Sequence, residues 1–283
     1  QEQGRYFELV QLSDWITKLE PRCTEIWAFH GWNMAYNVSV MMPDPEDRWR
    51  WVRNGIRLLR DQGLLFNPGD PALYFELGWI FQHKIGGTTD TAHEVYKQKW
   101  VTAMEELLGG PHPDYAEPAE DPAALRRLRE EYKLDPRIMR RVDERYGPLD
   151  WRLPETHALY WAFRGLQAGR RDTDLRCMRM IFQCLATLVK HGRMAPAPPG
   201  DAGRRREPDF SLLPGALRAY REALEAYPEE SVRTAYINFL RDTVGLLRRR
   251  RREEQARELY EVLRKEIPPG ELPPYAELPD EVP

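Results

Sequence analysis

Apolar residues recur at spacings of three and four along most of this 283-residue chain, and that periodicity predicts amphipathic helices. Alternating runs of β-branched residues are almost absent, so strands are not expected. We expect helices over 4–20, 24–41, 45–65, 71–84, 90–108, 121–133, 136–145, 154–168, 172–191, 211–226, 230–247 and 252–266. The pattern therefore predicts an all-α fold.

Prolines and aspartates mark the expected helix ends. Asp70-Pro71 and Leu153-Pro154 place proline in a first helical turn, where its missing N–H costs nothing. Asp44 and Asp47 are expected to cap the helix that begins near Arg48. Prolines that follow a periodic stretch, as helix terminators do, are Pro21, Pro43, Pro68, Pro228 and Pro268.

Three segments lack helical periodicity. Residues 109–120 are expected to form a loop, 192–209 a linker rich in proline, glycine and charge, and 268–283 an extended, acidic, proline-rich tail. The predicted organisation is 1–109 as N-terminal helix pairs, 121–191 as central helical hairpins, 192–209 as a linker, 210–267 as C-terminal helix pairs, and 268–283 as the tail.

Two motifs repeat within the chain. In the C-terminal third, a small residue, an aromatic, a small or apolar residue and a proline recur at the same spacing, as Ala216, Tyr220, Ala223 and Pro228 and again as Ala256, Tyr260, Leu263 and Pro268. In the N-terminal third, an aromatic precedes a large residue, a glycine and another large residue, as Trp27, His30, Gly31 and Met34 and again as Tyr74, Leu77, Gly78 and Phe81.

These motifs resemble the second and first helices of tetratricopeptide repeats, and the chain resembles bacterial proteins of that kind. The small residues would let helices approach closely, and the aromatics would fill the space between neighbouring pairs. The resemblance covers about two thirds of the chain, with long inserts and a poorly matching middle (110–190). It implies an irregular tetratricopeptide-like α-solenoid of antiparallel helix pairs; an unrelated helical bundle is the alternative.

Charge and composition exclude some classes. The net charge of -3 and the pI near 6.2 argue against a general nucleic-acid binder. No apolar run is long enough for a membrane helix. The chain begins at Gln1 without an initiator methionine, so we expect that something upstream was removed, whether a signal, an anchor or a cloning choice. The compartment and the oligomeric state stay open.

The richest candidate site lies in the first third of the chain. On a helix, His30, Asn33 and Asn37 fall on one face, where amides that donate and accept could receive a peptide backbone. The resemblance implies that such first helices line a concave groove. We expect its floor to include Arg53 and Lys84 as well. The structural alternative is that these side chains only hold neighbouring loops.

Other features favour structure over chemistry. The six histidines show no metal-ligand spacing, and no cofactor or catalytic motif is present. The turn Gly86–Asp90 is expected to join helices, with Thr89 or Asp90 as a cap. The run Arg248–Arg252 is expected to be a solvated turn that docks acids from the tail, although an anionic partner could use it. Cys177 and Cys184 are expected to be buried apolar residues.

The sequence therefore favours a non-catalytic scaffold or adaptor that binds a protein or peptide partner, without cofactor or metal. A second hypothesis is a small-molecule or glycan binder, or an enzyme, that uses the Trp/His/Asn cluster of 27–54. A third is a structural subunit of a larger assembly, which would expose large apolar patches when alone.

Overall fold

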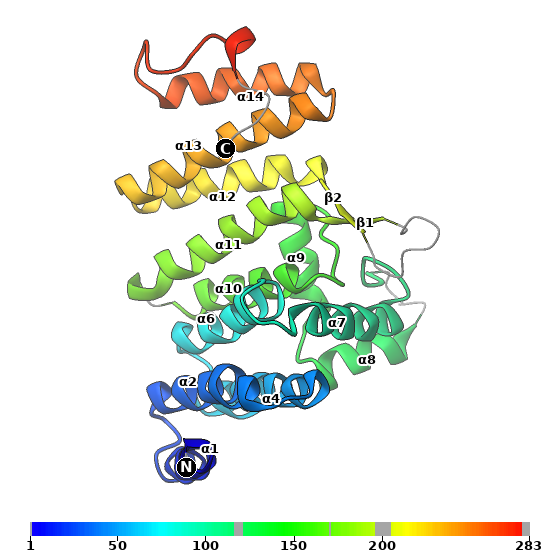
Figure 1. The fold of residues 1–283 in the computed structure, drawn as a ribbon, viewed down its shortest axis with the longest axis vertical. Helices are drawn as coiled ribbons and strands as arrows, with labels where there is room; N and C mark the ends of the chain where they lie inside the picture. The colour runs from blue at the N-terminus through cyan, green and yellow to red at the C-terminus, as the bar shows by residue number, and fades with distance from the viewer. Residues whose placement is uncertain (1, 116–120, 170, 196–204, 279–283) are drawn as a thin grey trace.

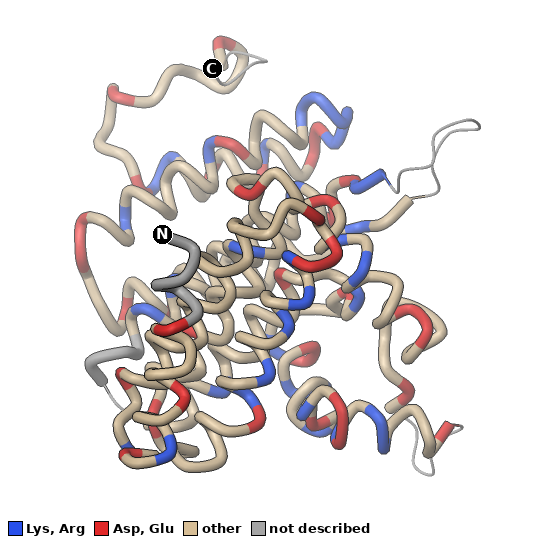
Figure 2. The backbone as a smooth tube through the Cα atoms, turned by 60° about the horizontal axis from the view of Figure 1, so that its bottom comes forward, with Lys and Arg blue, Asp and Glu red and all other residues tan. Residues whose placement is uncertain are grey.

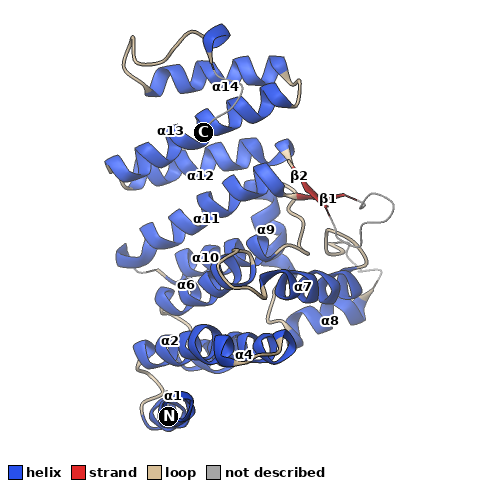
Figure 3. Ribbon diagram, in the orientation of Figure 1, coloured by secondary structure: helices blue, strands red, loops and turns tan. Residues whose placement is uncertain are grey.

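The computed structural model describes residues 2–115, 121–169, 171–195 and 205–278. Helices dominate these residues, and the prediction of an all-α fold is confirmed (Figure 3). The helices lie across the long axis of the molecule, broadly in chain order from α1 at one end to α14 at the other (Figure 1). Parts of the predicted loop 109–120, linker 192–209 and tail 268–283 lie outside the described residues.

The elements agree closely with the expected ranges. Up to residue 108 they are α1 (Glu2–Leu19), α2 (Thr24–Trp32), η1 (Asn33–Val38), α3 (Ser39–Met41), α4 (Pro45–Arg57), η2 (Leu58–Gly63), α5 (Leu64–Phe66), α6 (Pro71–Trp79), η3 (Ile80–Ile85) and α7 (His93–Leu108). Then follow α8 (Pro122–Glu131), α9 (Pro136–Tyr146), α10 (Pro154–Ala168), α11 (Arg171–His191), β1 (Arg193–Ala195), β2 (Arg205–Glu207), η4 (Phe210–Leu212), α12 (Leu213–Ala226), α13 (Glu230–Arg249), α14 (Glu253–Glu266) and η5 (Tyr275–Glu277).

Four helices begin with the same Asp-Pro pair. The aspartate accepts a hydrogen bond from a backbone N–H of the first turn, and proline occupies a position whose N–H would have no partner. The caps are Asp44 to Glu46 N (2.8 Å), Asp70 to Ala72 N (2.9 Å), Asp121 to Ala123 N (3.0 Å) and Asp135 to Arg137 N (2.9 Å). The predicted cap at Asp44 and the predicted helix start at Asp70-Pro71 are thereby confirmed, whereas Asp47 instead pairs with Arg50 at 2.8 Å.

Three long helices near the N-terminus contain a π-helical segment. The expected helices 24–41, 45–65 and 71–84 are each continuous, but η1, η2 and η3 interrupt their α geometry. Each π segment shifts the faces that the residues after it present, and such segments are frequent at functional sites. Two of them, η1 and η3, contact each other and carry most of the predicted site residues.

Glycines stand where α2 and α4 cross. A Cβ on Gly31 would lie 2.6 Å from Cγ of Leu59, and a Cβ on Gly55 would lie 2.7 Å from the carbonyl oxygen of Gly31. A Cβ on Gly78, the glycine in the second copy of the motif, would lie 2.6 Å from Sδ of Met180. The close approach expected from the motif is therefore present at both of its copies.

The C-terminal motif lies in the core. Its residues other than the two prolines are buried, and Tyr220 stacks on Phe182 at 4.3 Å and on Phe239 at 4.9 Å between ring centroids. The aromatic thus joins α12 to α11 and to α13, as its position in the motif predicts. The buried residues form one core cluster that runs from Trp27 to Leu263.

The ends of the predicted linker pair with each other. Strands β1 and β2 are antiparallel, with Arg193 opposite Glu207 and Ala195 opposite Arg205. Each strand has three residues, and a run that short shows no detectable periodicity in the sequence. The tail also differs from an extended segment, because Tyr275–Glu277 forms a 3-10 turn. Among the described residues, no helix is long and apolar enough to cross a membrane.

Candidate functional site

The predicted polar stripe lies in the interior. His30 and Asn33 are fully buried, and Asn37 Nδ2 donates a hydrogen bond to Asn33 Oδ1 at 2.9 Å. Burial lowers the pKa of His30 to about 4, despite the opposing charge of Asp14 on α1. Neither ring nitrogen of His30 has a partner among the described residues. The structure thus brings the stripe together, but it leaves only Asn37 partly exposed.

Lys84 is also buried, in an ionic network centred on Asp90. Its Nζ lies 2.5 Å from Asp90 Oδ2, and Arg48 Nη1 lies 3.3 Å from Asp90 Oδ1. Ala92 N and the hydroxyl of Tyr96 donate to the same carboxylate at 2.8 and 3.1 Å. Although burial favours the neutral acid, hydrogen bonds from Lys84 and Ala92 hold the pKa of Asp90 below its usual value. Asp90 therefore holds the turn before α7, but the N-cap of α7 is Ala92, so the predicted N-cap at Thr89 or Asp90 is wrong.

Arg53 does not join this group. It is exposed on α4 and lines a separate hollow between α4, α7 and the end of α8. The five predicted residues therefore occupy three environments: a buried polar stripe, a buried ion network and an exposed basic hollow. The spacing of His30, Asn33 and Asn37 predicted the stripe, but the packing of α1, α4 and α7 places the five residues in three separate environments.

A run of aromatic rings crosses η1, η3 and α6. Successive centroid distances are 5.8 Å for Trp32–Tyr36, 5.7 Å for Tyr36–His83, 4.9 Å for His83–Trp79 and 6.1 Å for Trp79–Phe75. The run ends on α11, where the Arg176 guanidinium lies 3.8 Å from the ring of Phe75. Trp32 is exposed, and the other rings are partly exposed. We did not predict this run, although its members within each helix are four residues apart.

The outer surface at the N-terminal end of the helix stack carries exposed apolar side chains. Every large hydrophobic side chain that is exposed in the described part of the chain lies between residues 9 and 66: Leu9, Leu12, Trp15, Leu19, Phe29, Trp32, Val40, Leu65 and Phe66. We call this set the apolar end. Helix α1 buries Ser13 and Thr17, whereas Leu12 is 49% and Trp15 56% exposed. The outer face of α1 is therefore more apolar than the residues it buries.

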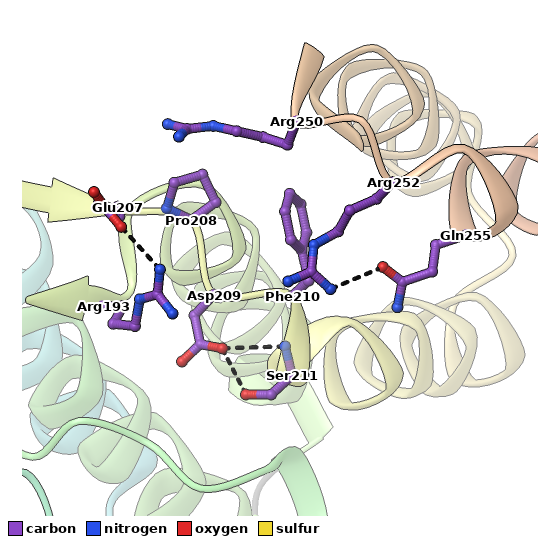
Figure 4. A pocket seen from close by; sticks show the side chains of 9 residues that line it. All are labelled: Arg193, Glu207, Pro208, Asp209, Phe210, Ser211, Arg250, Arg252 and Gln255. Carbon is purple, nitrogen blue, oxygen red and sulfur yellow. Dashed lines mark hydrogen bonds and ion pairs between the residues drawn. The ribbon is translucent and has the colours of Figure 1, made fainter. Parts of the chain in front are cut away.

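The arginine run Arg248–Arg252 spans the end of α13 and the turn into α14, and basic residues gather at this turn (Figure 2). The tail docks on it, because Arg248 Nη1 donates to the carbonyl of Leu278 at 2.5 Å and its guanidinium lies over the ring of Tyr275. Arg250 and Arg252 also line an open pocket of about 460 Å³ with Phe210 (Figure 4). Arg193 of β1 and Glu207 of β2 line the same pocket.

One ion pair and several hydrogen bonds join residues that line that pocket. Arg193 pairs with Glu207 at 2.8 Å, and Arg252 donates to Gln255 at 3.2 Å. Asp209 accepts hydrogen bonds from the backbone N–H and the hydroxyl of Ser211 (Figure 4). The side chains that line this pocket are thus engaged with one another, which favours a structural turn.

Potential metal ligands are dispersed among the described residues, and two of the three cysteines are buried. No group of three or more His, Cys, Asp or Glu side chains there could hold a metal ion. Cys177 and Cys184 are fully buried, and burial raises the pKa of Cys184 well above its usual value. Their predicted role as buried apolar residues is confirmed. Compared with known proteins, the chain matches no family model, no curated protein and no solved structure.

Proposed function

We propose that the chain is a non-catalytic protein–protein interaction scaffold, an irregular tetratricopeptide-like α-solenoid that holds a protein or peptide partner. The observation that carries this proposal is the apolar end. A helix face that contacts only water usually carries polar side chains, whereas α1 exposes leucine and tryptophan. Large exposed apolar patches mark sites of interaction.

The partner surface extends from α1 onto the aromatic run. Phe29 and Trp32 belong to the apolar end, and Trp32 begins the stack that continues through Tyr36 to α6. Aromatic rings are favoured at protein interfaces, because they bury much apolar area with few rotatable bonds. In this proposal Asn37 is available to a partner, whereas His30, Asn33 and Lys84 support the surface from beneath.

The test compares three baits in a cross-linked pull-down from the native lysate. The bait with Leu12→Ser and Trp15→Ser loses two exposed apolar side chains, and we expect it to lose the partner that the wild-type chain retains. The control carries Glu8→Ser and Gln11→Ser, two exposed polar positions of the same helix, and should retain it. Equal recovery of every protein by all three baits would contradict the proposal.

The same observation favours a second function, a structural subunit of a larger assembly. Stoichiometry separates the two, since an assembly subunit would be recovered in a complex of fixed composition and would self-associate when isolated. Light scattering of the purified chain against concentration decides this. A wild-type chain that remains monomeric, with a partner bound reversibly, supports the scaffold.

A further inference from the structure

A second hollow, distinct from the apolar end, lies between α4, α7 and the end of α8. Its volume is about 550 Å³, within the range of small-molecule sites. The residues that matter here are Trp49, Arg53, Arg57, Lys99, Trp100 and Tyr132. They combine aromatic walls with basic groups, which is the composition of a site for an organic anion.

Most charged groups around the hollow already have partners. Arg60 holds Asp61 through two hydrogen bonds of 2.6 and 2.9 Å. Lys99 pairs with Glu46 at 2.9 Å, and Arg127 pairs with Glu131 at 3.1 Å. Apart from these pairs, the charged residues that line the hollow are two arginines, Arg53 and Arg57, and one carboxylate, Glu130.

Arg53 and Arg57 are the exceptions. They lie four residues apart on α4, so their side chains project from the same face of the helix. Neither forms an ion pair or hydrogen bond with any described residue, and the exposed carboxylate of Glu130, which also lines the hollow, is not within ion-pair distance of them. Burial and the positive charge of Arg57 lower the pKa of Arg53, a strain that a bound anion would relieve.

The aromatic wall contains an unpartnered donor as well. Trp100 is 5% exposed and meets the rings of Phe81, Tyr132 and His157 edge to face, yet its indole N–H has no acceptor among the described residues. A buried donor without an acceptor costs free energy. Trp49 and Tyr132 complete the wall with apolar ring surface.

We propose that this hollow binds a small organic anion that has a flat, largely apolar body and one carboxylate or phosphate group. Arg53 and Arg57 would hold the anionic group, since guanidinium groups match the geometry of carboxylate and phosphate oxygens. The body would lie against Trp49, Trp100 and Tyr132. This site is independent of the partner surface proposed above, because its lining residues are not part of the apolar end.

Isothermal titration calorimetry with phenyl phosphate, benzoate and inorganic phosphate tests the assignment. We expect saturable binding of phenyl phosphate or benzoate, and the tighter of the two identifies the anionic group. Inorganic phosphate should bind at least about tenfold more weakly, because it lacks the ring. Binding of neither aromatic probe, or binding of inorganic phosphate as tight as that of phenyl phosphate, would overturn the proposal.

Matched variants locate the binding. Arg53→Gln with Arg57→Gln should weaken the tighter probe at least about tenfold, because charge-assisted hydrogen bonds are lost. Arg137→Gln with Arg141→Gln removes the same charge from two exposed arginines at the same spacing on α9, and should leave the affinity unchanged. Equal affinities of the two variants would refute the site.

Two further variants complete the test. Trp100→Ala removes part of the aromatic wall and should weaken the probe several-fold; unchanged affinity contradicts a role for that wall. Leu12→Ser with Trp15→Ser should leave the titration unaltered. The variant of Leu12 and Trp15 should lose partner binding but titrate normally, whereas the variant of Arg53 and Arg57 should bind the partner but titrate weakly. Because each variant affects one readout, failure of one proposal can be distinguished from failure of the other.

Discussion

Lys84 Nζ lies 2.5 Å from Asp90 Oδ2, and both side chains are 3% exposed. Asp90→Asn leaves Lys84 buried without its counter-ion, which costs roughly 3–5 kcal/mol in comparable pairs, whereas Lys84→Met leaves Asp90 with Arg48 at 3.3 Å. We expect both substitutions to lower the free energy of unfolding, Asp90→Asn more than Lys84→Met. The double variant should lose less than the sum, because it leaves neither charge behind. Urea unfolding of the four proteins measures this, and strictly additive losses would contradict the coupling.

Acid should also weaken this network. The pKa of Asp90 is lower in the folded chain than in the unfolded one, so its contribution is complete above the unfolded value of about 3.9. That contribution is lost as the pH falls through the folded pKa. In Asp90→Asn the decline of stability below about pH 4 should be shallower than in the wild type. Parallel curves for the two proteins would show that Asp90 does not titrate in this range.

His30 predicts a second pH dependence at milder acidity. Its folded pKa of about 4 is below the unfolded value near 6.5, so only the unfolded chain takes up the proton between these values. The free energy of unfolding should therefore fall by up to about 1.4 kcal/mol per pH unit as the pH drops from 6.5 toward 4. His30→Phe should remove the share of this slope that belongs to His30, whereas the share of His157, whose pKa burial also lowers to about 4, should remain. His112→Gln, at an exposed position, is the control and should keep the whole slope.

The amide pair distinguishes a structural from a binding role. Asn33 is fully buried and accepts from Asn37, which is partly exposed. Asn33→Ala should lower the free energy of unfolding by roughly 1–2 kcal/mol, since it loses a buried hydrogen bond and leaves a small void. Asn37→Ala should cost less. If chemical denaturation shows both variants to be as stable as the wild type, the amides do not hold the fold.

The crossing of α2 and α4 gives a prediction with a built-in control. Gly55→Ala would place a Cβ 2.7 Å from the carbonyl oxygen of Gly31, and Gly31→Ala one 2.6 Å from Leu59. Overpacking of this kind costs about 1–3 kcal/mol. Gly69→Ala meets nothing within 4 Å and should be neutral or slightly stabilising. Thermal melts of the three variants check this, and equal melting temperatures would show that the helices can separate at no cost.

Removal of Arg57 should not weaken the folded protein. Arg53 and Arg57 are like charges four residues apart on a helix, an arrangement that is destabilising by about 0.2–0.5 kcal/mol. Arg57→Gln is therefore expected to be as stable as the wild type or slightly more stable. A clear loss of stability in urea would mean that Arg57 has a structural partner, which contradicts its assignment to a ligand.

Local chemistry made several features readable from the sequence alone. Apolar periodicity predicted the helices, because a helix must bury one face. Asp70-Pro71 and Leu153-Pro154 predicted two of their starts, because the missing proline N–H acts within one turn. The repeated motifs gave the buried aromatics such as Tyr220 and the close helix approach at Gly31. Each of these depends on neighbours in the chain or on a side chain's own size.

Only the tertiary structure decided which faces are covered. Periodicity shows that a helix has an apolar and a polar face, but it cannot show that α1 turns Leu12 and Trp15 outward or that η1 encloses His30 and Asn33. The π-helical segments, the pairing of β1 with β2 and the meeting of Arg53 with Trp100 across one hollow likewise depend on elements distant in the chain. Whether a residue is buried depends on which other elements pack against it, and the spacing of residues within one helix carries no information about those elements.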